Sequence, residues 1–465
     1  MSVHSKHSSV AYQIKTLRDQ FAQSDELPFA NVLTAARLKR ALGEDDVSWS
    51  ERVFTPVVTL WAFLSQVLTA DGSCRAAAGR VAAWLVTQGR SACRVGSGAY
   101  CKARQRLPES FVRRLVRETG DELSHNAERG WLWKKRRVVL GDGSTHSMPD
   151  TSANQKAYPQ SATQMPGVGF PIVRSMFLFC LSTGAALNAA FAPFKGKKTG
   201  ENSLLRTILD TFRSGDIALF DRYFSGYFDA ALLKERGVDV VTRGHQLRKR
   251  DFRKGTRLGE RDHVVTWSKP QRPEWMDRDT YESLPVTMPM REVFVTVAQK
   301  GFRVRHFVVQ TTLLDADFAS RRDLAQLYRC RWHVELDLRS LKITLGMDVL
   351  TCKTPEMVRK EIWIRLLAYN LIRGLMAQSA YDLGDHPRDL SFKAALSLLR
   401  EIAASLHSAT GDTSIELRAA LLIAINDNRV NDRPDRVEPR KRKRRPKDYP
   451  HLNTTRQQAR EQLAA

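Results

Sequence analysis

The sequence RVVLGDGS, residues 137–144, contains a short apolar run that ends at Asp142. The sequence DIALFDRY, residues 216–223, repeats this pattern and ends its apolar run at Asp221. Such runs, bounded by turn-forming residues, predict buried β-strands. Open α/β sheets place their chemistry at strand ends, so both carboxylates are candidate site residues. The alternative is that each Asp is an N-cap or turn former.

The residues between and after these two runs predict the rest of one α/β sheet. The expected elements are β-rich runs at 172–182 and 187–194, helices near 201–212 and 225–236, and a strand at 238–242. The dipeptide Thr183-Gly184 between the two β-rich runs is a hairpin signal. This order, followed by a late acidic helix, is that of a ribonuclease H-like core, in which three carboxylates converge on two metal ions.

The late acidic helix has the sequence YRCRWHVELDLRSLK, residues 328–342. At about 100° per residue, Tyr328, Arg331, Glu335 and Lys342 fall within roughly a 60° arc of one α-helix. A carboxylate in this position suits a hard metal cation, and the neighbouring cations and phenol suit phosphate oxygens. The alternative is a charged, solvated helix face, because Arg and Glu at i, i+4 are common surface pairs.

The spacing Y-(2)-R-(3)-E-(6)-K, with LGDGS around Asp142 and FDRYFSGY around Asp221, resembles the DDE transposases of bacterial insertion sequences. More narrowly, it resembles the insertion sequence four family. The likeness extends to SCRA (73–76), GAYCKARQRL (98–107) and VEPRKRKRRP (437–446). By this resemblance Asp142, Asp221 and Glu335 would be the catalytic and metal-binding triad. Tyr328, Arg331 and Lys342 would be its phosphate-holding companions.

The resemblance implies two-metal phosphoryl transfer with Mg²⁺, for which Mn²⁺ could substitute. One ion would activate water and later the DNA 3′-hydroxyl, while the other would stabilise the leaving oxygen. We therefore expect hydrolysis that frees the element at its terminal inverted repeats and strand transfer that joins it to target DNA. Relatives of this kind often excise through a hairpin intermediate and act as homodimers on paired ends.

The charge of the chain independently favours nucleic acid as the partner. The sequence has 74 Lys and Arg against 50 Asp and Glu, a formal net charge of +24, which attracts polyanions. No apolar run reaches the roughly 20 residues of a membrane span, and the N-terminus lacks a signal-peptide core. The six cysteines show no CxxC pairing. We expect a bacterial cytoplasmic, nucleoid-associated protein with no membrane partner.

The sequence predicts four regions: a helical DNA-binding domain (1–130), a catalytic domain (131–380) with a β-rich insertion at about 244–315, C-terminal helices (381–428) and a basic extended tail (429–465). Helical periodicity in the first region appears at 54–68, 74–88, 98–107 and 109–124. The run RKRKRR in the last region predicts a DNA-binding arm. Its alternative is a solubilising tail.

Further DNA contacts are expected in the helical domain and in the insertion. Lys102, Arg104 and Arg106 belong to a short basic helix that suits docking in a major groove, although a solvated helix has the same composition. By the family resemblance, a tryptophan of the insertion can stack on a flipped base. Trp267 and Trp275 are the candidates, and ordinary packing is the alternative for each.

Three other functions have partial support in the sequence. The sequence GKKT at 196–199 has Lys197 where a phosphate-binding loop requires glycine. His245, Arg248 and Tyr281 match the pattern of a tyrosine recombinase, but Tyr281 lies among turn formers, and that mechanism would leave a covalent protein–DNA adduct. An inactive DNA-binding regulator derived from a transposase is the third alternative, which the presence of all three acids disfavours.

Overall fold

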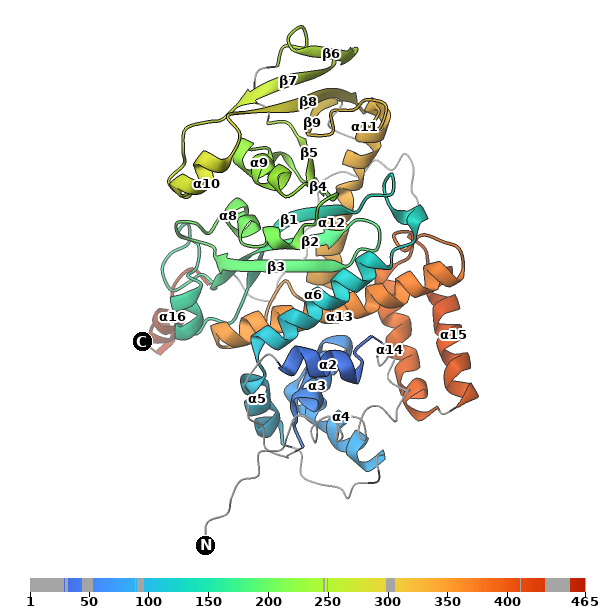
Figure 1. The fold of residues 1–465 in the computed structure, drawn as a ribbon. Coiled ribbons are helices and arrows are strands. Elements are labelled where there is room, and N and C mark those ends of the chain that lie inside the picture. Colours follow the sequence, from blue (N-terminus) through green and yellow to red (C-terminus); the bar gives the residue numbers. More distant parts are fainter. Residues whose placement is uncertain are drawn as a thin grey trace. The chain divides into compact units, whose positions relative to one another are not determined.

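One mixed sheet of nine strands runs in the order β3-β2-β1-β4-β5-β9-β8-β7-β6 (Figure 1). The computed structural model describes residues 29, 32–43, 53–87, 89, 96–245, 247–248, 250–297, 306–409, 411–430 and 452–464. Within these residues the fold is a mixed α/β fold with one large sheet and many helices. No helix of these ranges is long and apolar enough to cross a membrane.

The chain divides into two compact units. The helical unit contains the residues up to Trp131, the short segment Ser182–Asn188 and residues Asp337–Val430. The β-rich unit contains Leu132–Leu181, Ala189–Leu336 and the residues from Asn431 onward. The strands that the sequence predicted are present: β1 (Val138–Ser147), β2 (Ile172–Cys180), β3 (Ala186–Pro193), β4 (Ile217–Leu219) and β5 (Asp239–Arg243). All lie in the β-rich unit except the first three residues of β3, which belong to the helical unit.

The strand pairing places the ends of β1 and β4 side by side. β1 pairs antiparallel with β2 and parallel with β4, with Leu140 opposite Leu219. β4 in turn pairs parallel with β5, and the two are joined through helix α9 (Tyr227–Glu235). The apolar residues of β4 are fully buried, as expected for a central strand with both faces covered. Asp142 and Asp221 therefore lie on or just after two adjacent parallel strands.

The predicted helix at 201–212 is shorter than expected. It consists of α8 (Glu201–Arg206) and a separate 3-10 turn at Leu209–Thr211. A second 3-10 turn, Arg222–Phe224, follows directly after Asp221. Other helices of the β-rich unit are α7 (Ser152–Ala157), α10 (Arg278–Ser283), α11 (Arg321–Cys330) and α16 (Arg456–Ala464).

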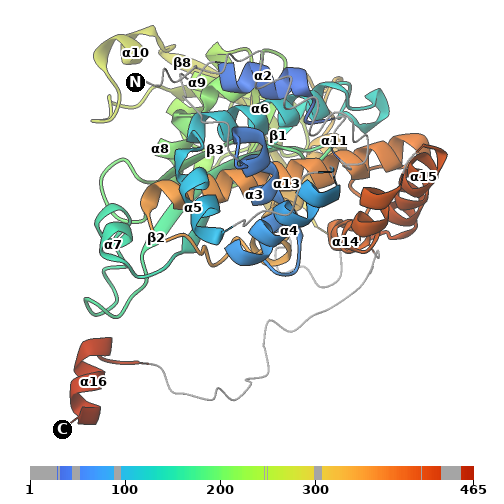
Figure 2. The ribbon, with the colours of Figure 1, turned by 90° about the horizontal axis from the view of Figure 1, so that it is seen from below.

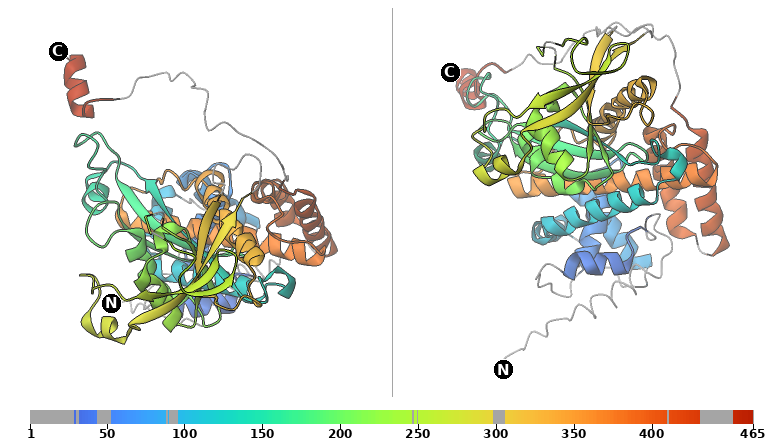
Figure 3. Two further views of the ribbon diagram at one scale, coloured as in Figure 1. Left: turned by 90° about the horizontal axis from the view of Figure 1, so that it is seen from above. Right: turned by 45° about the horizontal axis from the view of Figure 1, so that its top comes forward.

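The β-rich insertion continues the central sheet. β9 (His306–Thr311) pairs antiparallel with β5, and β8 (Thr287–Thr296) pairs with β9; Figure 3 shows these strands in yellow beside the green core. Both strands lie within the β-rich insertion that the sequence predicted at about 244–315. The charged stretch before them also contributes strands to the insertion, β6 (Thr256–Gly259) and β7 (Asp262–Ser268).

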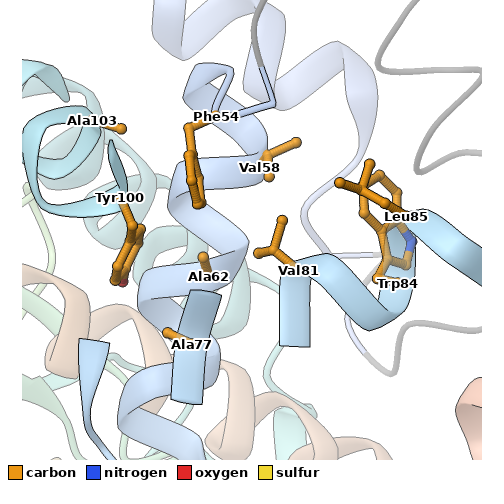
Figure 4. Packing of buried hydrophobic residues seen from close by; sticks show 9 residues of the cluster. All are labelled: Phe54, Val58, Ala62, Ala77, Val81, Trp84, Leu85, Tyr100 and Ala103. Atoms are coloured by element: carbon orange, nitrogen blue, oxygen red, sulfur yellow. The ribbon is translucent and has the colours of Figure 1, made fainter. Parts of the chain in front are cut away.

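The helical unit contains the four helices predicted near the N-terminus. They are α3 (Pro56–Leu68), α4 (Cys74–Thr87), α5 (Ser97–Arg106) and α6 (Glu109–His125). The remaining long elements of this unit are α2 (Ala35–Gly43), α13 (Pro355–Asp382), α14 (Phe392–Ser408) and α15 (Asp412–Asp427). The helix α6 runs along α13, and α14 packs beside α15 (Figure 2). Figure 4 shows the small core that α3, α4 and α5 share, with Phe54, Val58, Trp84 and Tyr100 among its members.

A buried asparagine on α13 ties separate stretches of the chain into the helical unit. The Asn370 side-chain amide donates hydrogen bonds to the carbonyls of Val116 (3.1 Å) and Ala186 (2.9 Å). Its side-chain oxygen accepts one from the Ala186 backbone N–H at 2.8 Å. Because one amide side chain satisfies several buried backbone groups, it fixes α6 and the start of β3 against α13.

The helix predicted at 328–342 is not continuous. It divides at Arg331 into α11 and α12 (Trp332–Arg339), and a π-helical turn, Ser340–Thr344, follows. A π turn changes the angle per residue, so the prediction that four side chains share one α-helical arc was wrong in this respect. The end of the tail forms α16, whereas an extended arm was expected. The basic run at 440–445 lies outside the described residues.

Candidate active site

Asp142 is a partly buried carboxylate with little compensating charge. Its side chain is 24% exposed, and its Oδ2 lies 3.9 Å from the Arg331 guanidinium. One carboxylate oxygen accepts a hydrogen bond from the backbone N–H of Gly143 at 2.8 Å. Burial raises the pKa of Asp142 to about 6, and the nearby carboxylates of Asp221 and Glu201 add to the rise. A cation bound here would relieve this unfavourable burial of charge.

Asp221 lies directly after β4, at the N-cap of a 3-10 turn. Its carboxylate accepts a hydrogen bond from the backbone N–H of Tyr223 at 2.8 Å, which is the capping role that its sequence position allowed. This role does not exclude a site role, because each carboxylate oxygen can accept more than one bond. Asp221 is close enough to raise the pKa of Asp142, so the structure brings the two strand-end aspartates together.

Glu335 lies on α12 and is held by Arg331. The Arg331 Nη2 donates to Glu335 Oε1 at 2.7 Å, and the Glu335 side chain is 37% exposed. The same guanidinium approaches Asp142 at 3.9 Å. Arg331 therefore links the helix carboxylate to the strand carboxylate in this conformation.

The donor chemistry of this centre suits a hard divalent cation. Carboxylate oxygens are the ligands that Mg²⁺ and Mn²⁺ prefer, and Asp142, Asp221 and Glu335 supply only such donors. Across the described ranges, however, no three His, Cys, Asp or Glu side chains are grouped closely enough to hold one ion. In this conformation Glu335 is bonded to Arg331 at 2.7 Å.

Tyr328 belongs to the same centre, whereas Lys342 belongs to the helical unit. Burial raises the pKa of Tyr328 to about 12, with Asp221 adding to the rise, so its hydroxyl stays protonated and can donate a hydrogen bond. Its ring packs against Phe307, with centroids 5.0 Å apart. The Lys342 Nζ lies 3.1 Å from Asp348 Oδ1 in the helical unit.

The three basic residues of α5 have different environments. Lys102 and Arg106 are exposed, whereas Arg104 is partly buried. The Arg104 guanidinium lies 4.8 Å from the Phe63 ring centroid and donates to Gln66 Oε1 at 3.2 Å. Because Arg104 is used inside the helical unit, Lys102 and Arg106 are the members of this set that α5 presents at its surface.

The two tryptophans of the insertion are both packed against arginines. Trp267 is 8% exposed, and the Arg248 guanidinium lies 3.7 Å over its ring. It lines a cavity of about 500 Å³ whose other walls include Arg250, Lys254, His263 and Glu292.

Trp275 lies under the Arg206 guanidinium, 3.5 Å from the ring centroid, and also meets Phe228 edge-on at 6.0 Å. This environment favours the packing alternative for Trp275. Trp267 remains the better candidate for stacking, because its ring borders a basic cavity.

Sequence reasoning missed two side chains near the candidate site. Trp332 directly follows Arg331 and is 55% exposed, and its place in the quoted helix could have identified it as an outward-facing aromatic. Glu201, the first residue of α8, is close enough to Asp142 to influence its pKa. No pattern in the sequence identifies Glu201, because its distance from Asp142 depends on how α8 packs on the sheet.

Comparison with known proteins gives consistent matches. The family described as "Transposase DDE domain" matches residues 133–371, about half of the chain. The transposase InsG for insertion sequence element IS4 of Escherichia coli K12 is 30% identical over 366 residues, which cover 77% of this chain and 78% of InsG. The transposase for insertion sequence element IS421 of Escherichia coli is 38% identical over 72 residues, covering 16% of this chain and 19% of that protein.

Among solved structures, the piggyBac transposase synaptic complex with hairpin DNA aligns over 89% of this chain and 85% of its own chain. The sequence identity is 10% and the TM-score is 0.40, which is too low to support a shared fold.

Proposed function

Because the chain belongs to the DDE transposases of the IS4 family, we propose that it excises and integrates an insertion sequence by metal-dependent cleavage and strand transfer at the element's terminal inverted repeats. The observation that carries this proposal is the pair of strand-end carboxylates, Asp142 and Asp221, beside Arg331 and Glu335. The strand order β3-β2-β1-β4-β5 with two central parallel pairs supports a ribonuclease H-like core for this site.

Asp142, Asp221 and Glu335 would hold the metal, for which two Mg²⁺ ions are proposed and Mn²⁺ is a substitute. Bound Mg²⁺ polarises phosphate oxygens and lowers the pKa of a coordinated water. Arg331 would release Glu335 and turn its planar guanidinium to the scissile phosphate, a geometry that suits bidentate binding. The protonated Tyr328 hydroxyl would donate a hydrogen bond to the same phosphate.

Recognition of the DNA would use surfaces outside this centre. Lys102 and Arg106 on α5 would contact the terminal repeat, and Trp267 with its basic cavity would receive an unstacked base. The basic tail would add affinity through phosphate contacts, which carry no sequence information. Lys342 is proposed as a phosphate contact from the helical unit. We propose a homodimer on paired ends, acting in the bacterial cytoplasm on nucleoid DNA.

A strand-nicking assay on duplexes that carry the element's own ends tests this proposal. We expect wild-type protein to nick at the element boundary with Mg²⁺ or Mn²⁺ and to be inactive in EDTA, whereas Asp142→Asn binds the same duplex without nicking it. Specific binding without metal-dependent nicking by the wild type would instead identify a DNA-binding regulator. A covalent protein–DNA adduct would identify a recombinase mechanism.

A further inference from the structure

The loop that leads from β3 to α8 (Figure 1) carries three exposed lysines. They are Lys195, Lys197 and Lys198, and none of them pairs with a carboxylate of the described residues. By contrast, the Lys134 ammonium of the same unit lies 3.0 Å from the Asp323 carboxylate. Three unpaired cations on one short loop repel one another and therefore favour an anionic partner.

Hydrogen bonds hold the backbone of this loop in one shape. The Thr199 hydroxyl donates to the Gly196 carbonyl at 3.0 Å, and the Arg174 guanidinium donates to the Thr199 carbonyl at 3.2 Å. Lys198 has a φ of +60°, in the left-handed region that is unfavourable for a residue with a Cβ atom. A glycine at this position would avoid the strain, so the lysine indicates a use for its side chain. A loop already held in shape also loses little conformational entropy on binding.

The sheet topology places this loop at the edge where the strand-end carboxylates lie. β1 runs antiparallel to β2 and parallel to β4, and β3 follows β2 through a short hairpin, so β1, β3 and β4 point the same way. A Cβ atom placed on Gly200, where the loop ends, would lie 3.7 Å from the Tyr223 hydroxyl. The Asn202 side-chain amide donates to the Tyr223 carbonyl at 3.4 Å, and the Tyr223 backbone N–H donates to Asp221 at 2.8 Å. The loop therefore adjoins the turn that Asp221 caps.

An exposed aromatic side chain borders the lysine loop. Phe170 lies just before β2 and is 58% exposed. At the start of the lysine loop, the Phe194 backbone N–H donates to the Ile172 carbonyl at 3.3 Å, which places Phe170 beside Lys195. Two backbone N–H groups of the segment before Phe170 donate to the Gln160 side chain, at 3.1 and 3.2 Å. Cations beside an exposed aromatic ring are typical of surfaces that bind nucleic acid.

We propose that this surface, formed by Lys195, Lys197, Lys198 and Phe170, binds target DNA during strand transfer, an inference that rests on the proposed function. The three ammonium groups contact phosphates of the target duplex, and such contacts carry no sequence information. Phe170 lies against sugars and base edges of the minor groove, where apolar side chains help to bend DNA. Contacts of this kind suit target DNA better than the terminal repeat, whose fixed sequence is read through hydrogen bonds to base edges.

Strand transfer by the full-length protein with pre-cleaved element ends, measured across a range of target DNA concentrations, tests this assignment. In the triple variant Lys195→Ala, Lys197→Ala and Lys198→Ala, the half-saturating target concentration should rise ~10-fold or more, because each lost phosphate contact weakens binding. The rate at saturating target should stay near that of the wild type. The dependence of log affinity on log salt should become shallower by up to about 2.7, which is about 0.9 for each phosphate contact.

Further variants separate local contacts from general charge and from folding. The matched control replaces Lys39, Lys135 and Lys393 with alanine, three exposed lysines elsewhere in the chain, and should capture target as the wild type does. Phe170→Ala should raise the half-saturating target concentration. Lys198→Gly should do the same while melting at or above the wild-type temperature, because glycine adopts the left-handed φ without strain. A lower melting temperature with unchanged target capture would assign Lys198 to the fold and contradict its proposed role.

Nicking of intact element ends, measured on the same preparations, separates this inference from the proposed function. We expect the triple variant to nick at the wild-type rate and to be impaired in target capture. Equal losses of nicking and strand transfer would place the surface on the element's own end and overturn the assignment to target DNA. Unchanged target capture by the triple variant would overturn the inference while the proposed function stands. If the wild type neither nicks nor transfers strands, the proposed function is overturned and the inference falls with it.

Discussion

Two aspartates of the β-rich unit differ in how their buried negative charge is compensated. In the insertion, Asp262 is 6% exposed and receives two hydrogen bonds from the fully buried Arg291, at 2.8 and 2.6 Å. In the core, Asp142 has its nearest guanidinium at 3.9 Å, and burial raises its pKa to about 6. The first charge is neutralised by the protein, whereas the second has no such close partner, and the proposed function assigns it to a bound cation.

The largest expected effect is the loss of chemistry at the core aspartates. Asp142→Asn or Asp221→Asn should reduce strand nicking by ~10³-fold or more, equivalent to about 4 kcal/mol of transition-state stabilisation, because an amide keeps the shape but loses the charge that binds Mg²⁺. Glu335→Gln should behave in the same way. DNA binding by gel shift should be unchanged, and near wild-type nicking by any one variant would remove that residue from the site.

A substitution in the insertion should change the free energy of unfolding by a similar amount. Asp262→Asn leaves the Arg291 guanidinium buried without its counter-charge, which typically costs about 3–5 kcal/mol. Urea denaturation of the variant should show this loss, while the nicking rate per folded molecule stays near that of the wild type. If stability is unchanged and nicking is lost, the contrast between the two aspartates is wrong.

A smaller effect of opposite sign is expected for the stability of Asp142→Asn. The pKa of Asp142 is raised in the folded state, so its charged form destabilises the fold at pH values above about 6. Without metal at pH 8, Asp142→Asn should therefore raise the unfolding free energy by roughly 1–3 kcal/mol. Between pH 6 and 4 wild-type Asp142 becomes protonated in the folded state and the advantage should shrink. A destabilised Asn variant at pH 8 would show that Asp142 is a structural charge like Asp262.

The smallest expected effect distinguishes a phosphate contact from a structural pair at Arg331. If the bond to Glu335 were a simple helix-surface pair, Arg331→Ala would cost only about 0.3–0.5 kcal/mol of stability and would leave nicking intact. We expect nicking to fall about tenfold, equal to about 1.4 kcal/mol, because the guanidinium is needed at the phosphate. Nicking rates and thermal melting, measured on the same preparation, separate the two outcomes.

The sequence predicted the parts of this site that depend on local pattern. Asp142 and Asp221 were found because each follows an apolar run, and the structure confirms both strands. The four N-terminal helices were found through their periodicity. The family resemblance to insertion sequence transposases is confirmed by the matches over most of the chain.

The parts that were missed depend on contacts between distant residues. The strand β7 was not recognised, because it lies in a charged stretch of sequence. Its Asp262 is neutralised by Arg291, which lies on another strand and is distant in the sequence. The sequence did not indicate Glu201 as a neighbour of the site, because its contact with Gly143 arises from the packing of α8. Arg104 was expected at a DNA surface, but it is used against Phe63 and Gln66 of α3. The π turn after Arg339 was not predicted, because an α-helical projection assumes a constant angle per residue.

Iron-mediated cleavage of the polypeptide tests most directly whether the core carboxylates bind the divalent cation. Fe²⁺ replaces Mg²⁺ in the protein, ascorbate and peroxide generate hydroxyl radicals at the bound ion, and mass spectrometry maps the cuts. We predict cuts next to Asp142 and Asp221 that excess Mg²⁺ suppresses and that Asp142→Asn abolishes, with no cuts next to Asp262. Cuts that persist in Asp142→Asn, or that centre on the insertion, would contradict the assignment of the metal to the strand-end carboxylates.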